Sequence, residues 1–145
     1  MKTAFSICSL FVMSVLVSSS LRAQSQSTEL EAITATLVDY IEGSTNGQPD
    51  RLKKAFHKDL NLYYAKDGEL KTWSGAAYIA DTKEGKPTGE VGKIISIDYE
   101  NDIATAKVQI SNPNNPVPYI DYFMLVKIQD HWTIIHKMFT KRVVE

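Results

Sequence analysis

The sequence predicts an α+β domain, in which about three helices cover one face of a curved antiparallel sheet. Apolar residues recur at helical spacing only before residue 83. From residue 93 onward, β-prone runs alternate with short turns. Helices followed by a series of strands are typical of α+β proteins, whose helices gather on one face of the sheet.

Residues 1–23 have the pattern of a secretory signal peptide. Lys2 gives a positive start, residues 5–17 are apolar, and Ala23 closes a stretch of small residues suited to cleavage. The apolar run is shorter than the roughly 20 residues that a membrane-spanning helix needs. We therefore expect an exported protein, periplasmic or secreted, with a mature domain at residues 24–145 and no membrane attachment after cleavage.

The composition of this mature domain argues against several kinds of chemistry. Cys8 leaves with the leader, so no disulfide, thiol nucleophile or thiolate ligand is expected. Without Lys2 and Arg22, the 16 basic residues fall to 14 against 17 acidic ones, a net charge of −3. Nucleic acid is not an expected partner, because no basic surplus remains to neutralise phosphates.

Two helices are predicted first. Residues 27–43 carry a helical apolar stripe, Thr28 and Glu31 have the spacing of a capping box, and Gly43 is a natural stop. The stripe consists of Leu30, Ile33, Leu37, Tyr40 and Ile41. Pro49 suits the first position of a second helix over residues 49–57.

The remaining elements are mainly strands. Asp67–Gly68 predicts a hairpin within residues 60–73, and Ser74 can cap a short third helix before a Gly- and Pro-rich loop at residues 83–92. Four strands are then expected at residues 93–99, 103–110, 119–128 and 131–141. Residues 111–118 are expected to be a connector, because their three prolines cannot donate to a ladder.

This order of elements resembles the nuclear transport factor 2-like superfamily, which includes ketosteroid isomerases and SnoaL-type cyclases. Within the superfamily, it resembles the exported bacterial family called putative lumazine-binding. The resemblance rests on LVDYIEG (37–43), LKKAFHKDLNLYY (52–64), GKIISIDYENDIATAKV (92–108) and the final hairpin with Trp132, Lys137 and Phe139. It implies a cone-shaped sheet with the helices on its concave face, a ligand in the mouth of the cone and pairing of two chains through the outer face.

The final hairpin supplies the candidate acid–base pair. A two-residue loop at Gln129–Asp130 sets Phe123 opposite His136, with Asp121 diagonal to His136 and Lys137 on the other face opposite Tyr122. Asp121 and His136 could then work as general base and acid. The alternative is a buried histidine that a carboxylate merely satisfies. A three-residue loop would exchange the two faces.

Aromatic residues suggest where a ligand binds. Tyrosine and tryptophan offer a flat apolar face with a polar tip, which suits a planar ligand, although they are also ordinary core residues. Of the adjacent Tyr63 and Tyr64, only one can face a cavity, and we expect Tyr64. The candidate ligand-binding residues are Tyr64, Trp73, Tyr78, Phe123, Trp132 and His136.

No metal or cofactor is expected. His57, His131 and His136 lack the spacing of metal ligands, and no nucleophile elbow, phosphate loop or dinucleotide fingerprint occurs. Asp98 with a tyrosine is a second conceivable base for isomerase chemistry, although carboxylates beside a turn are commonly solvated.

Three functions are consistent with these observations. The first is an exported domain that binds a small aromatic or apolar molecule and dimerises through the sheet, since both faces of the last hairpin are apolar. The alternative is a cofactor-independent lyase, isomerase or cyclase that uses Asp121 and His136. The third is a structural or protein-interaction module whose cone is filled by its own side chains.

Overall fold

The computed structural model describes the backbone of residues 7–143 and the side chains of residues 26–143. The predicted leader and its cleavage point at Ala23 lie outside the residues whose side chains are described, so both remain predictions. The chain forms two units, residues 1–32 and residues 33–145, and the whole sheet belongs to the second. In the described part of the chain, no helix combines the length and apolar character needed to cross a membrane.

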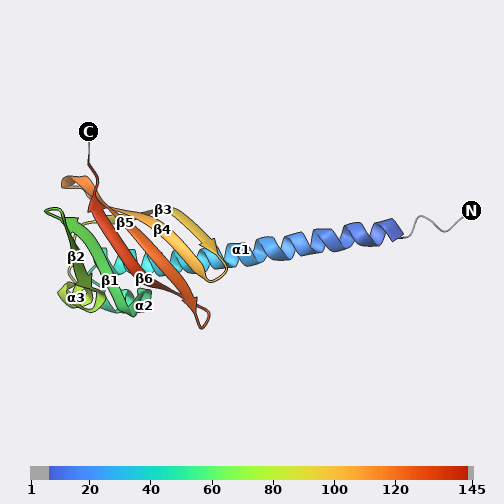
Figure 1. Ribbon diagram of the computed structural model, residues 1–145, viewed down its shortest axis with the longest axis horizontal. Helices are drawn as coiled ribbons and strands as arrows, with labels where there is room; N and C mark the ends of the chain where they lie inside the picture. The colour runs from blue at the N-terminus through green and yellow to red at the C-terminus, as the bar shows by residue number, and fades with distance from the viewer. Residues whose placement is uncertain (1–6, 144–145) are drawn as a thin grey trace, which may run out of the picture. The chain divides into compact units, whose positions relative to one another are not determined.

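The second unit is a six-stranded curved sheet with helices on its concave face, which confirms the predicted α+β fold (Figure 1). The strands lie in the order β2-β1-β6-β5-β4-β3. Neighbouring strands are antiparallel except β1 and β6, which are parallel, so the sheet is mixed. The strands are β1 (Phe56–Lys66), β2 (Glu69–Ser74), β3 (Val91–Glu100), β4 (Ile103–Asn112), β5 (Asn115–Ile128) and β6 (His131–Lys141).

Three helices precede or interrupt these strands. Helix α1 (Ile7–Thr45) contains the predicted helix 27–43, and Thr28 lies inside it, so the expected capping box does not begin the helix. Helix α2 (Pro49–Ala55) begins at its proline as predicted. Helix α3 (Gly75–Asp81) is capped by Ser74, whose Oγ accepts a hydrogen bond from the amide of Ala77 at 3.2 Å.

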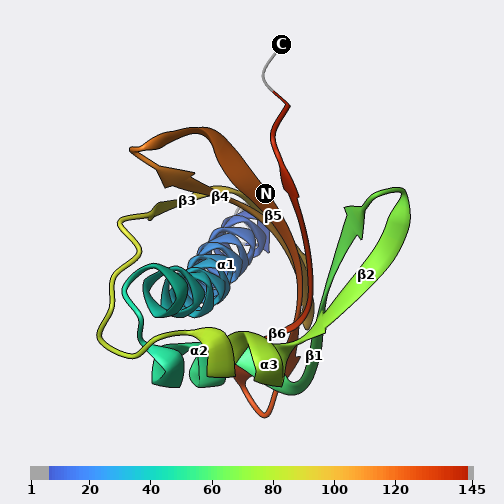
Figure 2. The same ribbon diagram turned by 90° about the vertical axis from the view of Figure 1, so that its left-hand side faces the viewer.

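The core lies between the end of α1 and the concave face of the sheet. Strands β3 to β6 curve around residues 33–45 of α1, and α2 and α3 lie below this part of the helix (Figure 2). Ile33, Leu37 and Tyr40 from the predicted apolar stripe are almost fully buried there. The sheet contributes Leu62, Val108, Phe123, Leu125, Trp132 and Ile134 to the same core.

One extra residue in β6 changes which side chains reach this core. Gln129 and Asp130 form the predicted two-residue turn, both with positive φ, and Ile128 pairs with His131. The register then shifts, because Leu125 pairs with Ile134 but Met124 pairs with His136, which leaves Ile135 as a β-bulge. Beyond the bulge, every side chain of β6 points to the face opposite to the one predicted.

The predicted connector at residues 111–118 is shorter than expected. Strand β4 continues to Asn112 and β5 begins at Asn115, so Pro116 and Pro118 lie within a strand. The pairing there is irregular, since the register shifts between Ile110 and Asn112. Proline is tolerated at such irregular ends because no ladder hydrogen bond is lost.

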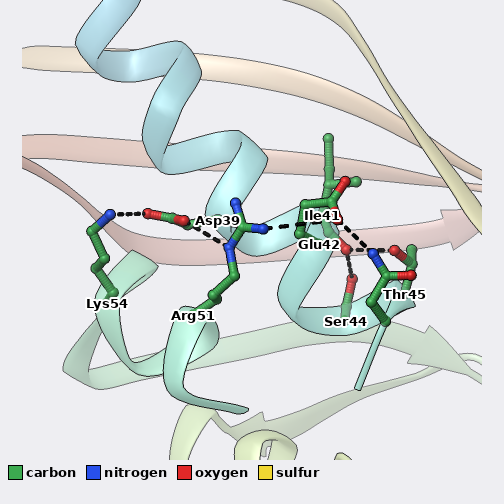
Figure 3. Close-up of polar contacts among 8 residues, drawn as sticks. Asp39, Ile41, Glu42, Ser44, Thr45, Arg51 and Lys54 are labelled. Carbon is green, nitrogen blue, oxygen red and sulfur yellow. Dashed lines mark hydrogen bonds and ion pairs between the residues drawn. The ribbon is translucent and has the colours of Figure 1, made fainter. Parts of the chain in front are cut away.

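An ionic cluster joins α1 to α2 (Figure 3). Asp39 is only 8% exposed. Its carboxylate accepts hydrogen bonds from Arg51 Nε at 2.9 Å and forms an ion pair with Lys54 Nζ at 2.6 Å. Burial raises the pKa of Asp39, but the hydrogen bonds and charges of Lys54 and Arg51 outweigh burial and hold the pKa below its usual value. Because the folded pKa is lowered, Asp39 stabilises the fold above its unfolded pKa of about 3.9.

We predict that Asp39→Ala lowers the free energy of unfolding by about 2 kcal/mol at pH 7, since charge-assisted hydrogen bonds are lost. The difference from wild type should vanish as the pH falls through the folded pKa of Asp39, where the carboxyl is protonated. Urea unfolding at pH 7 and at successively lower pH follows this difference. Glu69→Ala is the control, because it removes only an exposed pair with Lys71 and should leave stability unchanged. Equal stability of wild type and Asp39→Ala at pH 7 would contradict the prediction.

Candidate functional site

A buried polar network lies on the concave face of the sheet. It joins Tyr40 of α1, Asp121 of β5 and Lys137 of β6, which are 1%, 1% and 4% exposed. Lys137 Nζ donates a hydrogen bond to Tyr40 Oη at 2.5 Å, and Tyr40 Oη donates to Asp121 Oδ2 at 2.6 Å. Lys137 Nζ also lies 3.2 Å from Asp121 Oδ2. The three groups therefore form a closed triangle with a cation, an anion and a hydroxyl.

Aromatic rings surround the ammonium of Lys137. Its Nζ lies 4.6 Å from the ring centroid of Tyr40, 5.2 Å from Tyr78, 5.3 Å from Phe139 and 5.8 Å from Phe123. These distances are within the range of cation–π attraction. The rings and Asp121 together offset the cost of removing this charge from water.

Tyr40 remains a hydrogen-bond donor under ordinary conditions. Burial, followed by the charge of Asp121 and the neighbouring Tyr78, raises the pKa of Tyr40 well above its usual value. Its hydroxyl therefore keeps its proton and can relay a proton between Lys137 and Asp121.

The network forms part of the wall of a cavity of about 500 Å³. This volume lies within the range of about 300–1,000 Å³ that is typical of small-molecule sites. Trp73, Tyr78, Tyr119 and Phe139 supply flat apolar surface, and Trp73 meets Tyr78 edge to face at 5.0 Å. The other residues of the wall are Tyr40, Ser44, Gly47, Asp81, Thr82, Lys83, Lys86, Pro87, Thr88, Glu90, Ile110, Asp121 and Lys137.

The rim of this cavity is the loop between α3 and β3. Two backbone hydrogen bonds attach it to the α1–α2 connection, from Gly85 N to Gly47 O and from Thr88 N to Thr45 O, both at 2.8 Å. Gly47 has φ +64°, and a Cβ there would lie 2.4 Å from the carbonyl oxygen of Lys83. Only glycine fits this close approach, so the loop is held against the helices.

A second hollow of about 630 Å³ lies beside α2 and α3. Its ionisable side chains are exposed or half-exposed, including Lys53, Lys58 and His57 with 62%, 81% and 35% side-chain exposure. Because water screens the interactions of such exposed groups, the protein changes their reactivity little. The Asp121 cavity is therefore the better candidate site.

The expected pair of Asp121 and His136 does not form. Because of the bulge at Ile135, Lys137 instead of His136 is opposite Phe123 and shares the concave face with Asp121. His136 lies on the outer face opposite Met124, where it stacks on Tyr63 with ring centroids 4.6 Å apart. The register inferred from the sequence was wrong at this point, and the carboxylate has a lysine and a tyrosine as its partners.

The six predicted ligand-binding residues differ in their position relative to the cavity. Trp73 and Tyr78 lie in the cavity wall. Tyr64 and Phe123 lie behind it, the first stacked on Phe139 at 4.8 Å and the second against Tyr40 at 4.8 Å.

The other two predicted ligand contacts lie away from the cavity. Trp132 is buried elsewhere in the core, edge to face with Tyr99, and His136 is on the outer face. Asp98 of β3, the second conceivable base, pairs with Thr105 of β4 and is not part of the cavity wall.

Tyr40 and Lys137 are candidate site residues that the predicted ligand-binding set does not include. The sequence indicates Tyr40 only as part of the apolar stripe of α1. It places Lys137 on the face away from His136, where the side chain could contact either a ligand or a second chain. The consecutive residues Ile134 and Ile135 are compatible with either register, so the sequence holds no signal for the bulge. Among the side chains that the structure describes, no group of three or more His, Cys, Asp or Glu residues is arranged to hold a metal ion.

Comparison with known proteins identifies the family of this chain. The family model described as "Putative lumazine-binding" matches residues 28–140, which is most of the chain. The chain belongs to the putative lumazine-binding family. A solved structure described as a nuclear transport factor 2-like protein has the fold that the order of elements predicted.

One characterised relative is similar to this chain over most of its length. The aldolase FrzH of Cladobotryum sp. is 31% identical over 117 residues, which covers 78% of this chain and 91% of the relative.

Two solved structures show the same fold. A nuclear transport factor 2-like protein from Silicibacter pomeroyi has a TM-score of 0.69 at 24% identity and covers 81% of this chain and 98% of its own. A protein described as a putative scytalone dehydratase from Novosphingobium aromaticivorans has a TM-score of 0.60 at 18% identity and covers 83% and 89%. At these identities the likeness concerns the fold alone.

The buried ion pair predicts a strong energetic coupling between Asp121 and Lys137. Asp121→Leu or Lys137→Met alone leaves one charge buried and unpaired, which should cost about 3–5 kcal/mol of stability. The double variant removes both charges, so it should be at least as stable as either single variant. Urea unfolding of the four proteins gives the coupling energy. Additive effects of the two substitutions would show that the pair is not coupled.

Proposed function

We propose that this chain binds a small, flat carbonyl compound in the Asp121 cavity. The observation that carries this proposal is the buried Lys137–Tyr40–Asp121 network in the wall of a cavity that several aromatic rings also line. A largely apolar cavity with a few convergent polar groups is the usual form of a small-molecule site. The fold and family support small-molecule binding in general, and the network supports the narrower chemistry.

The polar wall favours a carbonyl group. An ammonium has three donors, and the described contacts of Lys137 to Tyr40 and Asp121 account for two. The third is available to an acceptor such as a carbonyl oxygen. The family name points in the same direction, because lumazine is a flat heteroaromatic compound with ring carbonyls. Trp73 and Tyr78 offer faces on which such a ring can stack.

Catalysis on a carbonyl compound is the second candidate function, favoured by the identity to the aldolase FrzH. Asp121 could remove a proton from the carbon beside the carbonyl, while Lys137 and Tyr40 stabilise the charge that develops on the oxygen. The acid–base alternative drawn from the sequence thus keeps Asp121, but its partner becomes Lys137 in place of His136.

We also propose that the chain is exported and that the mature protein begins near Gln24. This rests on the signal-peptide pattern of residues 1–23. The intact mass of protein recovered from its own source gives the position of cleavage directly.

A homodimer through the outer face of the sheet is the third part of the proposal. Tyr122, Met124 and Met138 are 46%, 50% and 48% exposed. Tyr122 pairs with Met138, and Met124 pairs with His136, so these side chains form one apolar patch on β5 and β6. A second copy of the same patch can cover it by two-fold symmetry.

The binding proposal predicts that a small molecule travels with the protein. Native mass spectrometry of wild type purified from its own source should show a bound mass. Lys137→Met prepared in the same way should carry at least about tenfold less, since a hydrogen bond from a charged donor is lost. Lys66→Met, which removes an exposed lysine, is the matched control. A wild-type chain that carries no molecule and binds none of a panel of flat aldehydes and ketones contradicts the proposal.

The dimer proposal predicts a mass of two chains by light scattering of the mature protein. Met124→Asp with Met138→Asp should give monomers, because two charges would be buried without partners. Thr72→Asp on the neighbouring part of the sheet is outside the patch and should leave the dimer intact. A wild-type monomer at micromolar concentration rules the dimer out.

A further inference from the structure

We propose that Lys137 is a nucleophile that forms an imine with an aldehyde or ketone bound in the cavity. This inference rests on the proposed binding of carbonyl compounds and names the covalent chemistry that the site adds. Lysine amines are the usual protein groups that condense with carbonyl compounds. They are suited to this role where burial and neighbouring groups control their proton.

The position of Lys137 is unusual for a structural lysine. The bulge at Ile135 turns it inward, and the residue is 4% exposed. Lys137 nevertheless belongs to the wall of the 500 Å³ cavity. Its Nζ lies beside Asp121, Tyr40, Tyr78 and Phe139, which line the same cavity, so we expect a molecule bound there to reach it. An exposed lysine on the outer face would keep its hydration and need no partner. The buried ammonium of Lys137 loses its hydration, and Asp121 and four aromatic rings surround it instead.

The network supplies the proton transfers that imine formation needs. An ammonium must lose a proton before its nitrogen can attack, and Asp121 Oδ2 lies 3.2 Å from Nζ. Tyr40 Oη offers a second route, since it accepts from Nζ at 2.5 Å and donates to the same carboxylate oxygen at 2.6 Å. The carboxylate is therefore the proton acceptor, and the tyrosine relays the proton.

The reaction balances with these groups alone. Asp121 takes a proton from the Lys137 ammonium, and the free amine attacks the carbonyl carbon as the π electrons move to oxygen. Asp121 exchanges protons between the nitrogen and that oxygen, which gives a carbinolamine. The protonated Asp121 then gives its proton to the hydroxyl, water leaves, and the nitrogen lone pair forms the C=N bond. One ammonium and one carbonyl compound become one protonated imine and one water, and Asp121 ends as a carboxylate.

The surroundings of Lys137 suit the product as well as the starting state. The protonated imine carries the same single positive charge as the ammonium, at the same atom. Tyr40, Tyr78 and Phe139, whose ring centroids lie 4.6–5.3 Å from Nζ, therefore attract both species. Asp121 remains beside that charge, so the buried site holds one cation and one anion before and after the reaction. The substrate class that fits is an aldehyde or an unhindered ketone with a flat apolar body.

Reductive trapping tests this inference. The mature protein is incubated with 4-hydroxybenzaldehyde and cyanoborohydride, which reduces an imine to a stable amine, and each lysine is followed by peptide mass spectrometry. We expect Lys137 to be labelled at least tenfold faster than Lys58, whose side chain is 81% exposed. A lysine that is 4% exposed and has a purely structural role would react more slowly than Lys58. Slower labelling of Lys137 than of Lys58 would therefore overturn the inference.

Variants identify the proton acceptor. Asp121→Asn should slow labelling at Lys137 at least tenfold and leave Lys58 unchanged. Asp130→Asn removes a carboxylate that is 98% exposed and should change neither rate. If Asp121→Asn does not fold, the comparison of Lys137 with Lys58 in wild type still decides the inference.

Binding is measured separately, so that the two proposals can fail independently. Trp73 lies in the cavity wall, so its fluorescence should change when a ligand occupies the cavity. The measurement uses a Trp132→Phe chain, in which Trp73 is the remaining tryptophan, and the same aldehyde without cyanoborohydride. The matching alcohol, 4-hydroxybenzyl alcohol, should compete for the cavity and protect Lys137 from labelling. Binding of the aldehyde without preferential labelling of Lys137 would overturn only the imine. The absence of both binding and labelling would overturn the proposed function as well.

Discussion

The site depends on the β-bulge at Ile135, because this one extra residue decides which side chains of β6 enter the core. Side chains alternate between the two faces of a strand, so a bulge reverses the assignment of every residue that follows it. Lys137 and Phe139 thereby face the helices, and His136 and Met138 face outward. Both the polar network and the apolar outer patch follow from that reversal.

Burial of Lys137 then places requirements on other elements. A buried charge needs an opposite charge and hydrogen-bond partners, and β5 supplies Asp121 while α1 supplies Tyr40. These contacts span nearly the whole domain, from residue 40 to residue 137. The same groups are held in place before any ligand arrives, and such preorganisation favours both binding and catalysis.

The fold by itself does not determine what happens in the cavity. Structures of this fold include a protein described as a putative scytalone dehydratase, and a relative that is 31% identical is named an aldolase. A shared fold can carry different chemistry, because function depends on a few side chains of the site. In this chain the buried polar groups of the cavity wall are a lysine, an aspartate and a tyrosine, beside several aromatic rings.

The sequence determined the order of the elements and the hairpin turns at Asp67–Gly68 and Gln129–Asp130, because these follow from local propensity and hydrophobic periodicity. It also indicated Trp73 and Tyr78 as residues of the cavity wall. Only the tertiary structure decided that Lys137 replaces His136 beside Asp121. A bulge without glycine leaves no local signature. Its effect is seen only in the packing, where Trp132 and Ile134 before the bulge and Phe139 after it all contact the same core.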